Sequence, residues 1–319
     1  MRIKNTKWDF NSMVQEFIER KYLLNMGSGK IGRTYNVDRN IVKDARVKAR
    51  EIINSETKSK FPKILIFDIE TTPLEAYVWQ KEVWRASIND DKIISNWYMI
   101  SWSAKWLFNN KMQSDVLTSK EILAEDDKRI VANLWALFDE ADIIIAHNSA
   151  NFDIPNMNTR FIVHDLPPPS SYQMIDTLRV ARKEFGFTHN SLNALAGVFG
   201  IDAKIDTNFN LWKQCKRGDA KALKEMEIYN RKDVEILEMV YLKVRPWIKS
   251  HPNIGLFLEE DSPVCPVFGG DIELNGKHYY TMVGKYPTYS CKKCGAISRS
   301  RKSVYNKDKS KSLVASVSR

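Results

Sequence analysis

The sequence predicts an α/β protein in which helices flank a mixed sheet, with a helical unit before it and a cysteine-containing segment after it. Two apolar runs typical of buried strands, at 64–70 and 143–147, come early in the central part of the chain. Helical patterns are interleaved later, and acidic residues lie within or just after the apolar runs. A length of 319 residues is enough for one large domain with smaller additions.

The charge is distributed unevenly along the chain. Residues 1–60 carry 14 Lys and Arg against 7 Asp and Glu, and residues 285–319 carry 10 against 1. Because the whole chain has a net charge of +10, the part between these ends is acidic. Basic ends around an acidic centre suggest polyanion-binding arms beside a carboxylate-rich active site.

Cysteine content and hydropathy exclude two classes of protein. Four cysteines are too few for a disulfide scaffold in a chain of this size. No apolar run approaches the ~18 residues of a membrane span. The first residues, Met1 to Lys7, lack the apolar stretch of a signal peptide. We therefore expect a cytoplasmic protein that has no membrane partner.

Residues 1–58 are expected to form a helix-turn-helix-like DNA-binding unit. Apolar residues between Phe10 and Tyr22 are spaced for one face of a helix. A glycine-containing turn at 26–37 precedes a helix rich in Arg and Lys, for which Asp38 is the expected N-cap. Many helical hairpins are only structural, so both interpretations of this unit stay open.

Residues 63–250 are expected to form the central domain. Its strands and helices are predicted from the spacing of their apolar residues, and turn residues such as Asn109-Asn110 separate them. We expect strands at 64–72, 93–106, 111–117, 143–147 and 172–176, helices at 126–141 and 153–164, and three or four further helices after 176.

Residues 258–300 resemble a zinc ribbon, and residues 301–319 form a basic tail that we expect to be disordered. Cys291-Lys-Lys-Cys294 has the spacing of one zinc knuckle, but Phe268 replaces the second cysteine of the knuckle that Cys265 begins. His278 is a candidate fourth zinc ligand. The alternative, which this departure favours, is a degenerate ribbon that binds no zinc.

Four acidic residues mark the expected active site. Asp68 and Glu70 are two apart in a predicted strand, so both carboxylates point to one face, where a bound cation would offset their repulsion. Asp153 follows a buried strand, at the strand ends where open α/β sheets place their ligands. Tyr229 and Asp233 are four apart in a helix and share a face. Four carboxylates of this kind can hold two divalent cations that clamp a phosphodiester.

Over residues 63–248 the chain resembles the DEDD exonuclease superfamily, in the branch that carries a tyrosine in its third motif. The resemblance rests on three motifs in a fixed order, Phe67-Asp-Ile-Glu-Thr71, Asn148-Ser-Ala-Asn-Phe-Asp153 and Tyr229-x-x-x-Asp233. It implies a ribonuclease H-like fold and a 3′–5′ exonuclease that uses two Mg²⁺ or Mn²⁺ ions. With its broken zinc ribbon, the whole chain is similar to stand-alone exonucleases of tailed phages.

The resemblance also implies roles for single residues. Asp68 would bridge both metals, Glu70 and Asp233 would bind the metal that activates water, and Asp153 would hold the second metal directly or through water. Tyr229 would orient the attacking water, because a phenol with a pKa of about 10 is a poor base at neutral pH. The substrate contacts would come from the same motifs, through Thr71, Asn148 and Phe152, whose ring would stack on the terminal base.

Two neighbouring residues are left out of the catalytic set. His147 ends a buried strand, where a structural role is expected, and Asp176 either supports the site or caps the helix that begins near Leu178.

The leading interpretation is a metal-dependent 3′–5′ exonuclease that acts on nucleic-acid ends, DNA rather than RNA, with replication or recombination proteins as its expected partners. One alternative is a transposase-like or recombinase-like enzyme, which would share the helix-turn-helix and the ribonuclease H-like fold. The close Asp68-x-Glu70 pair and the final Tyr229-x-x-x-Asp233 argue against it. Another is a non-catalytic DNA-binding protein, against which the presence of all four acids argues.

Overall fold

The structure is a computed structural model, which describes residues 8–19, 23, 26–57, 61–79, 88–201, 207–259 and 262–317. The chain divides into two compact units. One comprises Met1–Phe61 with Leu256–Asp261, and the other comprises Pro62–Gly255 with Ser262–Arg319. None of the helices in the described ranges is long and apolar enough to cross a membrane.

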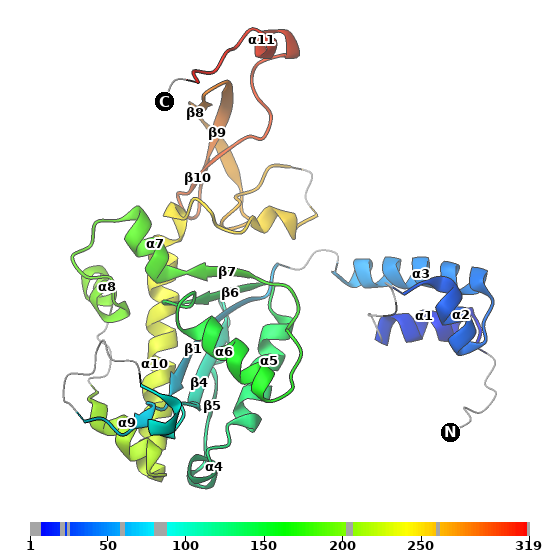
Figure 1. The fold of residues 1–319 in the computed structure, drawn as a ribbon. Helices are drawn as coiled ribbons and strands as arrows, with labels where there is room; N and C mark the ends of the chain where they lie inside the picture. Colours follow the sequence, from blue (N-terminus) through cyan, green and yellow to red (C-terminus); the bar gives the residue numbers. More distant parts are fainter. Residues whose placement is uncertain are drawn as a thin grey trace. The chain divides into compact units, whose positions relative to one another are not determined.

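The first unit is built from three helices, α1 (Phe10–Glu19), α2 (Ser28–Tyr35) and α3 (Arg39–Thr57) (Figure 1). The Asp38 side chain accepts a hydrogen bond of 2.8 Å from the amide of Asn40, so it caps α3 as the sequence predicts. The unit has an apolar core of its own, formed by Met13, Val14, Phe17, Leu23, Ile31, Val42, Ala45 and Ala49.

Helix α2 lies in residues 26–37, for which the sequence predicts a turn. Its two glycines lower its helix propensity, which is why the local pattern hides it. Gly32 is required by packing, because a Cβ there would lie 2.8 Å from the carbonyl oxygen of Val37. The buried side chain of Ile31 supplies the tertiary contact that stabilises this short helix.

The second unit contains a five-stranded mixed sheet with the strand order β5-β4-β1-β6-β7. Strand β1 pairs antiparallel with β4 and parallel with β6, while β4–β5 is antiparallel and β6–β7 is parallel. The strands are β1 (Ile64–Thr71), β4 (Met99–Trp106), β5 (Gln113–Val116), β6 (Ile143–Ala146) and β7 (Gln173–Asp176). The predicted α/β class with a mixed sheet is therefore confirmed.

Alternate residues of β1 face two different layers of helices. Phe67 packs edge-on against Phe138 of α5 (Lys128–Glu140), with ring centroids 4.8 Å apart. Asp68 faces the opposite side, where Asn230 of α10 (Ala220–Val244) contacts it. Helix α10, yellow in Figure 1, runs along this second face, so the polar side of β1 is turned toward α10.

The remaining helices of this unit surround the sheet and its strand ends. Besides α5, they are α4 (Ser119–Ala124), α6 (Asp153–Val163), α7 (Thr177–Glu184), α8 (Leu192–Phe199), α9 (Phe209–Lys216) and α10. The predicted helix at 153–164 is observed as α6. Within the described residues of the central domain, the four helices α7 to α10 follow β7, in line with the three or four expected. Short 3-10 turns are η2 (Asp90–Lys92), η3 (Arg245–Trp247) and η4 (Ile254–Leu256).

The strand expected at 93–106 is divided in two. Its first part, β3 (Ile93–Ser95), leaves the main sheet and pairs with β2 (Glu75–Ala76). The chain turns between β3 and β4, where the side chain of Asn96 accepts a hydrogen bond of 2.8 Å from the amide of Trp97. A local Asn–backbone contact of this kind competes with strand pairing.

The cysteine-containing segment forms a three-stranded antiparallel sheet in the order β10-β9-β8. Its strands are β8 (Ile272–Thr281), β9 (Gly284–Cys291) and β10 (Ile297–Arg299). The tail beyond it differs from the expected disorder, because it contains the short helix α11 (Lys307–Lys311). Asn306 caps this helix by accepting a hydrogen bond of 2.8 Å from the amide of Lys309.

A half-buried histidine follows the carboxyl end of α10. His251 Nδ1 lies 2.7 Å from the carbonyl oxygen of Pro252, which can only accept, so Nδ1 carries the proton and Nε2 accepts from the Tyr241 hydroxyl at 2.8 Å. Burial, with a smaller contribution from the Arg245 charge, lowers the pKa of His251 to about 4.

This pKa predicts a loss of stability in acid. The unfolded chain protonates His251 near pH 6.5, whereas the folded protein does so only near pH 4. The neutral imidazole therefore contributes its full stabilisation of the folded state above pH 6.5. This stabilisation is lost as the pH falls from 6.5 through 4. We expect a loss of about 3 kcal/mol in the free energy of unfolding between these values. Urea unfolding at a series of pH values measures it. His251→Gln should lack this component, whereas His278→Gln, at an exposed histidine, should follow the wild type.

Candidate active site

The polar side of β1 ends in two carboxylates. Asp68 pairs with Ser103 of β4 and Glu70 pairs with Ser101, so both acids lie on the α10 face of the sheet. A β-bulge between Glu70 and Thr71 interrupts this pairing just after the second acid. Strand β1 is also where the strand order changes direction, which is where open α/β sheets bind their ligands.

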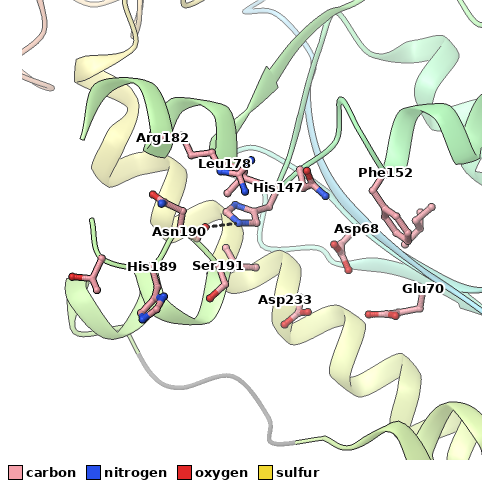
Figure 2. A pocket seen from close by; sticks show the side chains of 14 residues that line it. Asp68, Glu70, His147, Phe152, Leu178, Arg182, His189, Asn190, Ser191 and Asp233 are labelled. Atoms are coloured by element: carbon pink, nitrogen blue, oxygen red, sulfur yellow. Dashed lines mark hydrogen bonds between the residues drawn. The ribbon is translucent and has the colours of Figure 1, made fainter. Parts of the chain in front are cut away.

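Helix α10 adds a third carboxylate to this pair. The side chain of Asp233 is buried and faces β1. Asp68, Glu70 and Asp233 each offer an oxygen, and these three oxygens lie within 4.8 Å of one another. Figure 2 shows the three side chains at one end of the same pocket. The structure thus brings together three of the four predicted acids from two elements far apart in the sequence.

Asn230 belongs to the same cluster and was not identified from the sequence. Its amide nitrogen donates a hydrogen bond of 2.7 Å to Asp68 Oδ2, although the two residues are 162 positions apart. Asn230 is fully buried, and its Oδ1 has no hydrogen-bond partner among the described residues. The only sequence signal was its place beside Tyr229, within the third motif. The contact fixes which oxygen of Asp68 is turned toward the pocket.

The fourth acid, Asp153, lies deeper than the other three. It begins α6 and is 1% exposed, and its Oδ1 has no hydrogen-bond partner among the described residues. Burial raises the pKa of Asp153 to about 7, and the charge of Asp176 adds to this, whereas backbone amides, including that of Ile69, act in the opposite direction. The Ile69 contact places Asp153 beside the strand that carries Asp68 and Glu70.

The loop that precedes Asp153 is held by Asp176. This carboxylate accepts hydrogen bonds from the amides of Asn148 at 3.0 Å and Ala150 at 3.1 Å. It also accepts from the amides of Leu178 and Arg179, so it caps α7, one of the two roles expected for it. Asn148 adopts a left-handed backbone conformation with φ of 70°, which asparagine tolerates better than most residues.

A cavity of about 590 Å³ opens beside the carboxylates, within the size range of small-molecule sites. Phe152 lines it and is 40% exposed, so this ring is not part of the core. Asn148 lines it as well, whereas Thr71, at the end of β1, is half-buried and lies outside the lining.

The far wall of the cavity comes from residues that no sequence motif singles out. Arg182 of α7 is exposed there, and the segment before α8 contributes His189 and Ser191 (Figure 2). His147 also lines the cavity. Its ring nitrogens lie 2.9 Å from the Thr177 hydroxyl and 3.0 Å from the Asn190 carbonyl oxygen, which fits the structural role expected for it.

Tyr229 lies one helical turn before Asp233 but does not line the cavity. Its side chain is 7% exposed and packs edge-on against Trp212 of α9, with ring centroids 5.8 Å apart. The spacing of four residues places its Cα–Cβ bond on the same face of α10 as that of Asp233. The structure therefore places Tyr229 next to the acidic cluster, in a packed position.

The donor set suits divalent cations. Carboxylate oxygens are the ligands that Mg²⁺ and Mn²⁺ prefer. Three carboxylate oxygens within 4.8 Å of one another would repel strongly without a cation, and the buried Oδ1 of Asp153 is a further oxygen with no hydrogen-bond partner among the described residues. These residues fit the metals that the resemblance implies.

The cysteine segment has its own cluster. Cys265, Cys291 and Cys294 lie together, with their sulfur atoms within 4.8 Å of one another. His278, the candidate fourth ligand, is not with them. It is exposed on β8 and pairs with Pro287, four residues before Cys291, or roughly 13 Å away along β9.

Comparisons with known proteins agree with this fold. Residues 106–245 match the family model of the RNase_H superfamily, and the matched segment contains Asn148, Asp153, Tyr229 and Asp233. This match, together with a mixed sheet flanked by helices, supports a ribonuclease H-like fold and a nucleic-acid-cleaving enzyme. No curated protein sequence is significantly similar to the chain.

A solved structure is similar in fold to part of the chain. It is the family B DNA polymerase from the hyperthermophilic archaeon Pyrobaculum calidifontis, with 14% sequence identity and a TM-score of 0.41. The similarity covers 58% of this chain and 25% of the polymerase chain. The matched part of this chain spans about a quarter of the length of that polymerase.

Proposed function

We propose that the protein is a metal-dependent 3′–5′ exonuclease that hydrolyses phosphodiester bonds at single-stranded DNA ends. The observation that supports this most is the convergence of Asp68, Glu70 and Asp233 on one cation-sized space beside an open cavity. Divalent cations bound there would activate a water molecule and neutralise charge on the phosphate. Asp68, Glu70 and Asp233 would hold them, with Asp153 as the fourth carboxylate.

The protein's own side chains would orient the substrate. Phe152 is exposed at the edge of the cavity, where it can stack on a terminal base. Arg182 on the opposite wall can pair with a phosphate. Asn230 holds Asp68 in one orientation by its hydrogen bond of 2.7 Å, and Tyr229 would orient the attacking water. Asn148, which lines the cavity, would contact the terminal nucleotide, and Thr71 would do so only from beyond the present lining.

The test is digestion of DNA and RNA strands labelled at either the 5′ or the 3′ end, with Mg²⁺ and with EDTA. We expect 3′-labelled strands to release mononucleotides at once, and 5′-labelled strands to shorten one nucleotide at a time. EDTA should stop both. Discrete internal cuts or strand joining would favour the transposase-like enzyme instead, and binding without any cleavage would favour the non-catalytic DNA-binding protein.

We further propose that the N-terminal unit contacts the DNA backbone through α3. Arg39 and Lys43 are exposed on this helix, while Arg46 donates a hydrogen bond of 2.6 Å to the carbonyl oxygen of Met26 and packs over Phe17, which gives it a structural role. Arg46 is therefore held by contacts within the unit, whereas Arg39 and Lys43 are exposed to solvent. Only the exposed residues are candidates for phosphate contacts.

Replacing Arg39 and Lys43 by alanine in the full-length protein should weaken binding to duplex DNA. Each lost phosphate contact should reduce the slope of log K against log salt by roughly 0.9. Fluorescence anisotropy across a salt series measures this slope. Lys120→Ala with Lys128→Ala removes the same charge from exposed positions of the second unit and serves as the control. Equal slopes for the two double variants would mean that α3 does not contact the backbone.

A further inference from the structure

The cysteine segment contains two turns with the same backbone hydrogen bonds. In the first, the amide of Cys265 donates to Gly270 O at 2.8 Å, and Gly269 donates back to Cys265 O at 2.7 Å. In the second, Cys291 donates to Ala296 O at 3.0 Å, and Gly295 donates back to Cys291 O at 3.0 Å.

Even the glycines of the two turns correspond. Gly269 has φ of 74° and Gly295 has φ of 73°, a left-handed conformation that glycine adopts without strain. Superposing the turns in register would place Cys265 on Cys291 and Phe268 on Cys294. The two turns thus share one backbone conformation, although only the second of them contains two cysteines.

The three thiols meet where these turns face each other. Cys265 Sγ and Cys294 Sγ are 3.7 Å apart, and all four cysteines of the chain are free thiols. Two thiolates bound to one tetrahedral zinc ion at about 2.3 Å are roughly 3.8 Å from each other. The amide of Cys294 also donates to Cys291 Sγ at 3.5 Å, which stabilises negative charge on that sulfur.

Phe268 stands at the position in the first turn that Cys294 occupies in the second, so no fourth cysteine is present there. The ring of Phe268 lies under the guanidinium of Arg245 at 4.9 Å and the amine of Lys293 at 5.2 Å, and meets Phe108 edge-on. These contacts give Phe268 a packing role. Among the described residues, no histidine, acid or further cysteine joins the three thiols.

We propose that Cys265, Cys291 and Cys294 bind one Zn²⁺ ion, with its fourth coordination position left to water or an external ligand. Three clustered thiolates select a thiophilic cation over Mg²⁺. The segment has little apolar support of its own, because its buried cluster consists of Cys265, Val267, Cys291 and Ala296, and two of these four are the thiols themselves. A bound ion would therefore add to the stability of the segment.

The site can be tested in the full-length protein, purified under reducing conditions. We expect one thiol-bound zinc per chain by elemental analysis after the acidic site has been cleared with excess Mg²⁺. Cobalt substitution should give a thiolate-to-cobalt charge-transfer band, which carboxylate ligands cannot produce. Cys294→Ala should lose the band, and Cys215→Ala, which removes a thiol from α9, should keep it.

Phe268→Cys supplies the missing fourth thiolate, so this variant tests the site by a gain of zinc affinity and not by a loss. It should raise the chelator concentration that releases half of the zinc by at least about tenfold, and strengthen the cobalt band by about one third, since four thiolates replace three. If the wild type gives no charge-transfer band, or forms a Cys265–Cys294 disulfide when freshly purified, the proposal is overturned. It is also overturned if only Phe268→Cys binds zinc.

Discussion

Asp68→Asn is expected to reduce the rate of nucleotide release by at least about 1000-fold, or about 4 kcal/mol of activation free energy. The change removes the charge that would hold the cations but keeps an oxygen that can accept the hydrogen bond from Asn230. Folding should be preserved, because one fewer charge among three crowded carboxylates relieves repulsion. Release of labelled mononucleotides and thermal unfolding, both with the same preparation, measure the two effects.

The matched control for Asp68→Asn is Glu227→Gln. Glu227 lies on α10 and accepts a hydrogen bond of 2.6 Å from Ser114 of β5, so it occupies the same layer but stays outside the cavity. Its replacement should leave the rate within about twofold of the wild type. Asp233→Asn should behave as Asp68→Asn does. Appreciable cleavage by purified Asp68→Asn would show that the acidic cluster is not the catalytic centre.

Local pattern was enough to predict most elements of the central domain. The apolar residues 64–67 are buried on both faces of the sheet, and the amphipathic period of 128–140 places Phe138 in the core, so each pattern has one structural solution. Prediction from local pattern failed where contacts between residues distant in the sequence determine the secondary structure. Helix α2 forms because Ile31 is buried by the rest of its unit, although its glycines disfavour a helix.

The same division applies to the acidic cluster. Spacing places Asp68 with Glu70 because a strand has a period of two, and this needs no tertiary information. The contact between Asn230 and Asp68 depends on how α10 crosses β1, and no local pattern encodes that crossing. The depth of Asp153 and the cavity wall at Arg182 depend likewise on the packing of α6 and α7.

Tyr229→Phe should lower turnover by about 10- to 1000-fold, or about 1.4 to 4 kcal/mol, if its hydroxyl orients the attacking water. The substitution keeps the ring, and therefore keeps the packing against Trp212 at 5.8 Å, so that only the hydroxyl is tested. The Mg²⁺ concentration that gives half of the maximal rate should not change, because the phenol is not a metal ligand. Single-turnover cleavage over a Mg²⁺ series separates the two quantities.

Tyr241→Phe is the matched control, since it removes a buried hydroxyl from the same helix α10, where it contacts His251 rather than the acidic cluster. It should reduce stability and leave turnover unchanged. Because Tyr229 is packed against Trp212, a purely structural role for its side chain is the clear alternative. A Tyr229→Phe protein with wild-type turnover would assign this side chain to the contact between α9 and α10, and the orientation of water would then rest on the carboxylates alone.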